Sequence, residues 1–439
     1  MQFLKIKFPV FLLLSVNQIS TVLSGIIGIR ILTSYLGSDV YGRVNLYMTI
    51  SILCTMVGYG PITNGIHRIF ATSLEQKSGM LFLKSTVKLL LNTSFLVSII
   101  SLIVFPILGE IVSLDFGLLT LFSPVLFAIL TGSSSAFVGM LNIAEKRSQF
   151  VIFQSILPWA RIFFAIYFHL RTDGTSIVPF FLGYCIADFI ILLLGVIFLK
   201  NYLKSISLRE LTNENEYLKD NTIFIKQILS YSYPFMIWGV FSWIQASSDR
   251  WVISYFSDSS NLGSYIVIWQ LGFYPVTLTS NLLNQFYQPY LYKFNNNSNR
   301  DNEFEKLRVI FKKFILSAIL IFIVLFMLAL FFHDIANILV VNKTFDIDTN
   351  KIKYLVLASS FIAIGQIMSS IFTVTKRTSR LIAPQIYLPI IYFGILVFCT
   401  KIWSVDGVVF GNMAYGLLYM MVLTFVSLKE FNLFKKTSH

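Results

Sequence analysis

The sequence has few charged residues and few groups that could hold a metal ion or a nucleotide. Asp, Glu, Lys and Arg make up 13% of its 439 residues, about half the share found in soluble proteins. Its three cysteines and four histidines are scattered, so they predict neither a disulfide framework nor a metal site. No Walker sequence, HExxH pair or glycine-rich nucleotide loop occurs. These absences exclude a recognisable ATPase domain, and we expect no cofactor.

The chain consists instead of long apolar runs. Hydrophobic residues make up 56% of it, and a helix of about 20 apolar residues crosses a bilayer. We therefore predict an all-α polytopic membrane protein with about twelve transmembrane helices. The predicted spans lie near residues 8–32, 44–64, 85–108, 116–141, 150–170, 177–199, 231–256, 262–286, 309–332, 353–375, 381–400 and 406–428. Gly58, Gly60 and Pro61 interrupt the second span, which makes it the least regular. The first run is too long for a signal sequence, so we expect it to stay uncleaved.

The formal net charge of +13 raises the question of a nucleic-acid partner. The basic residues, however, alternate from loop to loop. One predicted side carries most of them, including Lys5, Lys7, Lys146–Arg147 and Lys376–Arg377, while the other carries few. Basic loops face the cytoplasm and its anionic lipids. The pattern therefore predicts two cytoplasmic termini, which agrees with an even number of spans, and no nucleic-acid partner.

The longest predicted cytoplasmic loop, residues 200–230, falls midway along the chain and contains ELTNENEYLKDN. It is expected to link an N-terminal six-helix lobe, residues 1–199, to a C-terminal six-helix lobe, residues 231–439. Because six is even, the two lobes enter the membrane in the same orientation. Such lobes form a parallel repeat related by a pseudo-two-fold axis along the membrane normal.

A short repeated pattern supports an internal duplication. RILTSYLGSDVYG begins at Arg30, and RWVISYFSDSSNLG begins at Arg250, half a chain later. In each copy an Arg precedes Ser-Tyr by the same spacing, and a polar turn then ends in Gly at the start of the next span. Repeats at a fixed offset are common in transporters.

Two charged residues fall near the middle of adjacent spans. Arg161 lies in the fifth span and Asp188 in the sixth, at similar depth because the two spans run in opposite directions. Charges inside a membrane are costly and usually face protein or a wet cavity. Two interpretations stay open: a structural ion pair, or an Arg161 that binds an anionic substrate while Asp188 holds it.

The seventh span carries a second polar group. Ser242, Gln245 and Asp249 step by three and four, so they share one face that we interpret as lining a pore. Arg250 points about 100° away from Asp249; it either extends to the membrane surface or contacts a neighbouring helix. Arg30 ends the first span near the outer surface. On that span Asn17, Thr21, Ser24 and Gly28 form a stripe that fits either helix packing or a cavity wall.

The whole chain resembles polysaccharide or O-antigen flippases of the multidrug/oligosaccharidyl-lipid/polysaccharide exporter superfamily. The resemblance rests on twelve spans and on four short motifs: Arg30–Gly42, Ser232–Phe235 (SYPF), Asp249–Ile253 (DRWVI) and Leu262–Tyr265 (LGSY). It implies a V-shaped pair of lobes around a cationic cavity that opens by alternating access. The first motif has Ser38–Asp39 where the family usually has Pro-Glu.

The resemblance also implies a cargo and partners. The cargo would be an undecaprenyl-diphosphate-linked oligosaccharide, an O-antigen or capsule repeat unit, moved from the cytoplasmic to the outer leaflet of a bacterial inner membrane. Arg30, Arg161, Arg250 and Gln245 are the expected substrate-binding residues, since arginine suits phosphate oxygens. Asp188 and Asp249 are the expected coupling or charge-pair residues, for H⁺ or Na⁺. The expected partners besides lipid are a glycan polymerase and chain-length proteins.

Two other function classes are alternatives. A drug or cation antiporter of the same superfamily would favour acidic cavity residues, whereas the intramembrane charges here lean cationic. A membrane glycan polymerase would be an enzyme, and such proteins resemble many-span chains with a large outer loop. The largest predicted outer loop here, near residues 333–353, is too short for that class.

Overall fold

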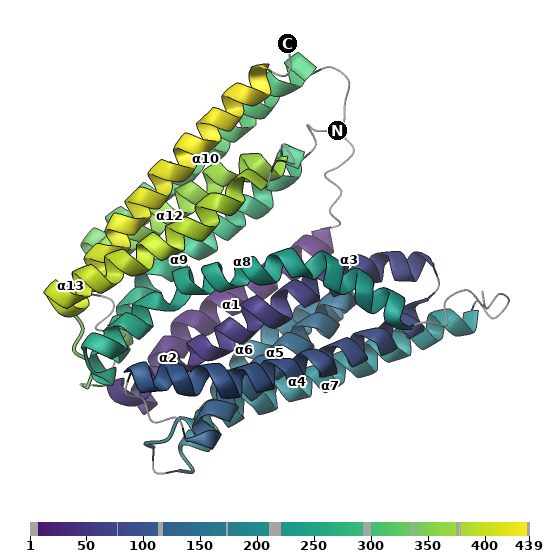
Figure 1. Cartoon of the computed structure of the whole chain (residues 1–439), viewed down its shortest axis with the longest axis horizontal. Coiled ribbons are helices and arrows are strands. Elements are labelled where there is room, and N and C mark those ends of the chain that lie inside the picture. Colours follow the sequence, from purple (N-terminus) through teal and green to yellow (C-terminus); the bar gives the residue numbers. More distant parts are fainter. Residues whose placement is uncertain are drawn as a thin grey trace. The chain divides into compact units, whose positions relative to one another are not determined.

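The computed structural model describes residues 8–76, 78–112, 117–172, 174–209, 221–292, 300–334, 338–340, 342, 344–374, 377 and 379–436. The regular elements of these residues are helices (Figure 1). In chain order they are α1 (Phe8–Tyr35), α2 (Ser38–Leu53), the π-helix η1 (Cys54–Tyr59), α3 (Gly60–Glu75), α4 (Gly79–Val112), α5 (Leu118–Ile143), α6 (Arg147–His169), α7 (Val178–Arg209), α8 (Asn221–Phe256), α9 (Ser259–Tyr292), α10 (Arg300–Phe332), α12 (Lys351–Val374) and α13 (Ser379–Lys436). Lys5, Lys7, Lys376 and residues 210–220 of the expected linker lie outside the described residues.

The described helices confirm an all-α chain built to cross a membrane several times. Ten of them are long and apolar enough to span a bilayer. One of the ten, α13, is two helices joined at the non-helical residues Trp403 and Ser404. Helix α8 adds a further 36 residues that are less apolar, because they include Gln245, Asp249 and Arg250. Counting both parts of α13 and adding α8 gives the expected twelve.

The second span continues through the residues that were expected to interrupt it. Residues 54–59 widen into a π-helical turn, and α3 follows directly at Gly60. Pro61 sits in the first turn of α3, where proline costs little because that N–H would lack a helical partner anyway. The Ser232 hydroxyl of α8 donates a hydrogen bond to the Pro61 carbonyl at 2.8 Å. This hydrogen bond joins α8 to the start of α3.

The contacts divide the chain into two compact units. Unit 1 comprises residues 1–36 and 43–243, and unit 2 comprises residues 37–42 and 244–439. Helix α8 therefore contributes its first part to unit 1 and its second part to unit 2. The short segment 37–42, which includes the first turn of α2, clusters with unit 2.

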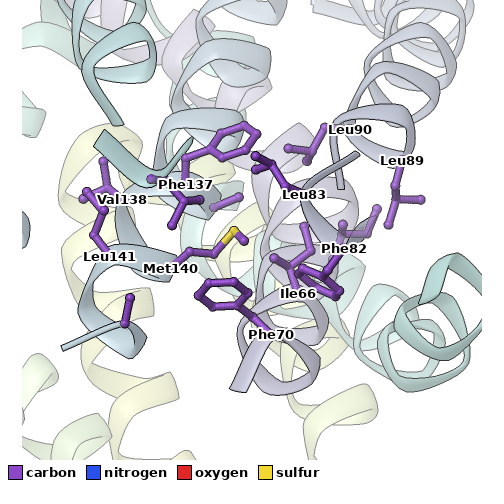
Figure 2. Packing of buried hydrophobic residues seen from close by; sticks show 14 of the residues in the cluster. Ile66, Phe70, Phe82, Leu83, Leu89, Leu90, Phe137, Val138, Met140 and Leu141 are labelled. Carbon is purple, nitrogen blue, oxygen red and sulfur yellow. The ribbon is translucent and has the colours of Figure 1, made fainter. Parts of the chain in front are cut away.

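The core of unit 1 lies among α3, α4 and α5. Phe70 of α3, Phe82 of α4 and Met140 of α5 are fully buried there (Figure 2). Gly132 lets α5 approach the ring of Tyr59, because a Cβ at this position would overlap that ring. Lipid tails are as apolar as these side chains, so close packing rather than exclusion of water holds such helices together.

Unit 2 packs α12 against α13 and α9, and its two ends are tied by polar groups. At one end, Lys351 of α12 meets Asp406 of α13 with Nζ and Oδ1 2.5 Å apart. At the opposite end of α13, Glu430 accepts hydrogen bonds from Arg377 and Arg380. The turn at Ser404 and the start of α12 therefore lie at the same end of unit 2. This is expected for successive helices that alternate in direction.

The two copies of the repeated pattern meet inside unit 2. A Cβ added at Gly42 would overlap the Ser259 carbonyl of α9, and a Cβ added at Gly263 would overlap the Ser38 carbonyl. The Ser38 and Ser260 hydroxyls are 2.6 Å apart. Helix α9 starts at Ser259 because Asp258 caps it, accepting the Asn261 N–H at 2.7 Å. The glycine of each segment thus lies against a serine carbonyl of the other segment.

Candidate functional site

The two mid-membrane charges of unit 1, Arg161 and Asp188, form a bidentate ion pair. Arg161 of α6 donates from Nε to Asp188 Oδ2 at 2.8 Å and from Nη2 to Asp188 Oδ1 at 2.7 Å. The pairing expected from the depth of the two residues is therefore present. Asp188 of α7 is fully buried, whereas the Arg161 side chain is 23% exposed. The pair buries its negative member and leaves part of its positive member accessible.

Helix α5 completes the surroundings of this pair. Thr131 accepts a hydrogen bond from Arg161 Nη2 at 3.3 Å, and Ser134 donates one to Asp188 Oδ1 at 3.3 Å. The guanidinium lies over the Phe127 ring, 5.1 Å from its centroid. A buried ion pair is stable only when further hydrogen bonds satisfy its remaining polar atoms. The two hydroxyls of α5 do this, and the sequence analysis missed them.

The first helix places Arg30 near its end, where the side chain is exposed. Among the described residues of unit 1, no hydrogen bond or ion pair joins Arg30 to Arg161. The polar stripe of α1 packs mainly against α6: Ser155 donates to Asn17 Oδ1 at 3.3 Å, and Gly28 faces Ile162. Thr21, in contrast, is exposed. Helix packing therefore accounts for most of the stripe.

Unit 2 holds a second buried polar group, built by α8, α9 and α13. Tyr265 of α9 donates to Asp249 Oδ2 at 2.8 Å, and Asp249 Oδ1 accepts the Arg250 N–H at 2.9 Å. Asn412 donates to the Tyr265 hydroxyl at 3.2 Å, and Tyr392 donates to Asn412 Oδ1 at 3.0 Å. Asp249 is 2% exposed. A chain of neutral hydroxyl and amide groups therefore leads from its carboxylate into α13.

Arg250 is buried and contacts a neighbouring helix, so it does not extend to the surface. Its Nη1 donates to the Ala246 carbonyl at 2.8 Å, and its guanidinium lies 4.7 Å from the Trp269 ring centroid on α9. Nη1 is 3.9 Å from Asp249 Oδ1, so the attraction between these neighbours is weaker than in a direct ion pair. Gln245, one turn earlier, is half-buried.

The structure therefore brings the expected residues together in two places. Arg161 and Asp188 meet in unit 1, and Asp249 and Arg250 lie together in unit 2. Tyr265 and Asn412 are the important residues that sequence reasoning missed. Asn412 is a polar residue inside the last predicted apolar span, and this was the sequence signal that could have identified it. Among the described residues, no three His, Cys, Asp or Glu side chains are placed to hold a metal ion.

Comparison with solved structures shows which fold carries these sites. An inward-facing multidrug resistance MATE family transporter of the MOP superfamily superposes with a TM-score of 0.72 at 14% identity, covering 98% of this chain and 100% of that one. A MOP superfamily transporter from Pyrococcus furiosus, described as having a binding pocket of reverse polarity, superposes with a TM-score of 0.57 at 15% identity, covering 97% of this chain and 94% of that one. At these identities the likeness shows the fold.

The sequence comparison is more specific about the family. No curated protein matches the chain. The family described as "Polysaccharide biosynthesis protein" matches residues 10–295, which is more than half of the sequence and includes both Arg161–Asp188 and Asp249–Arg250. This multi-pass membrane protein therefore belongs to the polysaccharide biosynthesis protein family and has the fold of the MOP superfamily transporters.

Proposed function

We propose that this protein is a flippase that moves an undecaprenyl-diphosphate-linked oligosaccharide from the cytoplasmic to the outer leaflet of a bacterial cytoplasmic membrane. The observation that carries the proposal is the uneven burial of the Arg161–Asp188 pair. A purely structural pair gains nothing from an accessible guanidinium. Arg161 nevertheless keeps 23% of its side chain exposed, while its partner is fully buried.

The donors of Arg161 suit a phosphate ligand. Asp188 occupies Nε and Nη2, and among the described residues no hydrogen bond uses Nη1. Two N–H groups of a fixed, charged fork are thus left for a phosphate oxygen. Because Asp188 holds the fork in place, little side-chain entropy is lost when the cargo binds. Arg30, Arg250 and Gln245 stay candidate contacts for the rest of the head group.

Asp249 is the better candidate for the coupling ion. Asp188 is neutralised by a two-pronged arginine, whereas Asp249 receives one hydroxyl and one backbone N–H, with Arg250 at 3.9 Å. A buried carboxylate whose charge is only partly compensated is the better ligand for a coupling cation. Asp249→Asn is expected to abolish dependence on the ion gradient while cargo binding persists. If transport by the variant and by the parent protein depended equally on the ion gradient, Asp249 would not be the coupling residue.

The direct test counts lipid-linked oligosaccharide on each face of proteoliposomes that contain the purified protein. The parent protein is expected to equilibrate the lipid between the leaflets. Arg161→Ala is expected to stop this, and Arg171→Gln, which changes an exposed arginine next to Tyr167, is the matched control. Normal transport by Arg161→Ala would contradict the proposal.

A charge swap separates cargo binding from pairing. Arg161→Asp combined with Asp188→Arg keeps an ion pair but moves the cation to the buried position on α7. We expect this protein to insert and fold without transporting cargo. Restored transport in the swapped protein would show that only the pair matters and that Arg161 does not contact the cargo.

The second candidate function is ion-coupled export of drugs or organic cations, because the superposed structures include multidrug resistance MATE transporters. The two functions differ in the charge of the cargo. A cation exporter is expected to lower drug susceptibility on overexpression and to tolerate Arg161→Ala. Drug resistance together with unchanged glycan output after deletion would favour this candidate. In either case we propose a transporter and not an enzyme, with both termini in the cytoplasm. A glycan polymerase and chain-length proteins are the proposed partners.

A further inference from the structure

Three charged side chains meet at the end of α13 that is opposite its Ser404 turn. Arg377 donates from Nη1 to Glu430 Oε1 at 3.1 Å, and Arg380 donates from Nη1 to Glu430 Oε2. Glu430 is 1% exposed, whereas the Arg377 and Arg380 side chains are 35% and 46% exposed. A buried carboxylate thus holds two accessible guanidinium groups side by side. The transport sites described above do not use this cluster.

The cluster is suited to one negative charge. Two arginines and one glutamate leave a local charge of +1. Each guanidinium carries five N–H donors, and the hydrogen bonds to Glu430 use one nitrogen of each. The remaining donors are held at a fixed separation by the shared carboxylate. Such paired forks match the oxygens of a phosphate, and a phosphodiester carries the single charge that would complete the balance.

Exposed apolar side chains lie at about the same depth as the cluster on both parts of α13. Ile382, two residues beyond Arg380, is 57% exposed, and Leu428, two residues before Glu430, is 52% exposed. The two parts of α13 run antiparallel, so these two side chains lie at the same level. Phe425, one turn further along, is 70% exposed. In a transmembrane helix, exposed apolar side chains of this kind face the lipid tails.

We propose that Arg377 and Arg380, positioned by Glu430, bind the phosphate of an anionic phospholipid. Basic groups at the end of a membrane helix are common sites for lipid head groups. Inorganic phosphate offers the same oxygens but no tails. The exposed apolar helix surface at the same depth, which faces lipid tails in a membrane, is what favours the lipid over the soluble anion. The site is independent of the cargo proposed above.

The test titrates the full-length protein in detergent with phosphatidylglycerol, phosphatidylcholine or inorganic phosphate. Bound lipid is counted by native mass spectrometry, and thermal stability is followed in parallel. Arg377→Gln/Arg380→Gln is expected to weaken phosphatidylglycerol binding by about tenfold or more, because both charge-assisted contacts are lost. Lys429→Gln is the matched control, since Lys429 is exposed and adjacent to Glu430 but points to another side of the helix. Its affinity is expected to stay unchanged.

Each other outcome overturns the proposal. Unchanged phosphatidylglycerol binding in the double variant would show that the arginines are not the site. An equal loss in Lys429→Gln would show diffuse attraction to positive charge. Equal stabilisation by inorganic phosphate would show a soluble anion site. If the double variant does not fold, Arg380→Gln and Arg380→Lys replace it, because both keep the Arg377–Glu430 bond. The Gln variant is expected to lose more affinity than the Lys variant, and identical parent-like affinities would contradict the proposal.

Discussion

Two buried tyrosines of unit 2 differ in what their hydroxyl groups bind. Tyr265 and Tyr415 are both 1% exposed, but they differ in their hydrogen bonds. The Tyr265 hydroxyl donates to Asp249, whereas the Tyr415 hydroxyl has no hydrogen-bond partner among the described residues. The same chemical change at the two positions should therefore have different results.

We predict that Tyr265→Phe lowers the free energy of unfolding by about 1.5–3 kcal/mol, the usual range for a hydrogen bond to a charged group. Tyr415→Phe removes an unsatisfied buried hydroxyl and is expected to be neutral or stabilising. Thermal unfolding of the two purified variants in one detergent tests the pair. Equal destabilisation of both proteins would mean that ring packing, and not the bond to Asp249, controls stability here.

Ser404 is a second residue whose backbone sets its role. Its φ of 50° and ψ of −132° place it in a region that glycine adopts far more easily than serine. We predict that Ser404→Gly raises the stability by about 1 kcal/mol. Ser369→Gly inside α12 is the control and should cost about 0.5–1 kcal/mol, as glycine does in a helix. A loss of stability in Ser404→Gly would show that the turn depends on the serine side chain.

At this scale the sequence predicted the Arg161–Asp188 pair because depth along two adjacent antiparallel spans can be counted. It did not predict the Asp249–Tyr265–Asn412 group. Those residues come from three helices, and their meeting depends on how the helices rotate about their axes. Residue spacing within one helix carries no information about that rotation. The buried position of Arg250 against Trp269 escaped prediction for the same reason.

The π-helical turn of the second span shows how much the backbone preferences of glycine and proline predict about a helix. Gly58, Gly60 and Pro61 correctly mark an irregular backbone, and η1 ends at Tyr59. They do not show that the helix continues. The sequence also gives no sign of the contact with Ser232, which is 171 positions away and donates to the Pro61 carbonyl where α8 packs against α3. A local reading of the sequence therefore finds the irregularity but neither the continuation of the helix nor this distant contact.

The close approach of segment 38–42 to α9 gives a test at the level of elements. Gly42→Ala or Gly263→Ala places a methyl group onto a backbone carbonyl, which cannot rotate away. We predict that each costs about 1–3 kcal/mol, as overpacking does. Gly394→Ala in α13 is the control, because no atom lies within 4 Å of its added Cβ. Expression and thermal stability should fall in the first two variants only. Two tolerated substitutions would contradict the packing described here.

At the scale of the whole molecule, loop lengths and contacts divide the chain at different places. Loop length predicts where the chain leaves the membrane, and on this basis the expected lobes are separated by residues 200–230. Contacts show which helices pack together, and the division they give falls at Trp243–Ile244 inside α8. A helix shared by two units cannot be recognised from hydropathy, because both of its parts are apolar. The relation of the expected lobes by a parallel two-fold axis stays a prediction.

The basic loops give a test of the topology of the whole chain. We predict that a reporter fused after residue 436 is active on the cytoplasmic side, and that single cysteines at Ser404 and Arg171 react with a membrane-impermeant thiol reagent from outside. The physical reason is the enrichment of Lys and Arg in alternate loops. Labelling of a cysteine at Arg147 from inside only serves as the control. Outside labelling at that position would reverse the predicted orientation.

The reciprocal approach of Gly42 to Ser259 and of Gly263 to Ser38 has an evolutionary consequence. Two identical subunits that meet across a two-fold axis make every contact twice, with the same atoms exchanged. The two glycine contacts have this form within a single chain. A half-length ancestor would have met a second copy of itself through one glycine and one serine carbonyl. The predicted internal duplication would have divided a single position into two, and each would then have to be preserved separately, since neither glycine can replace the other.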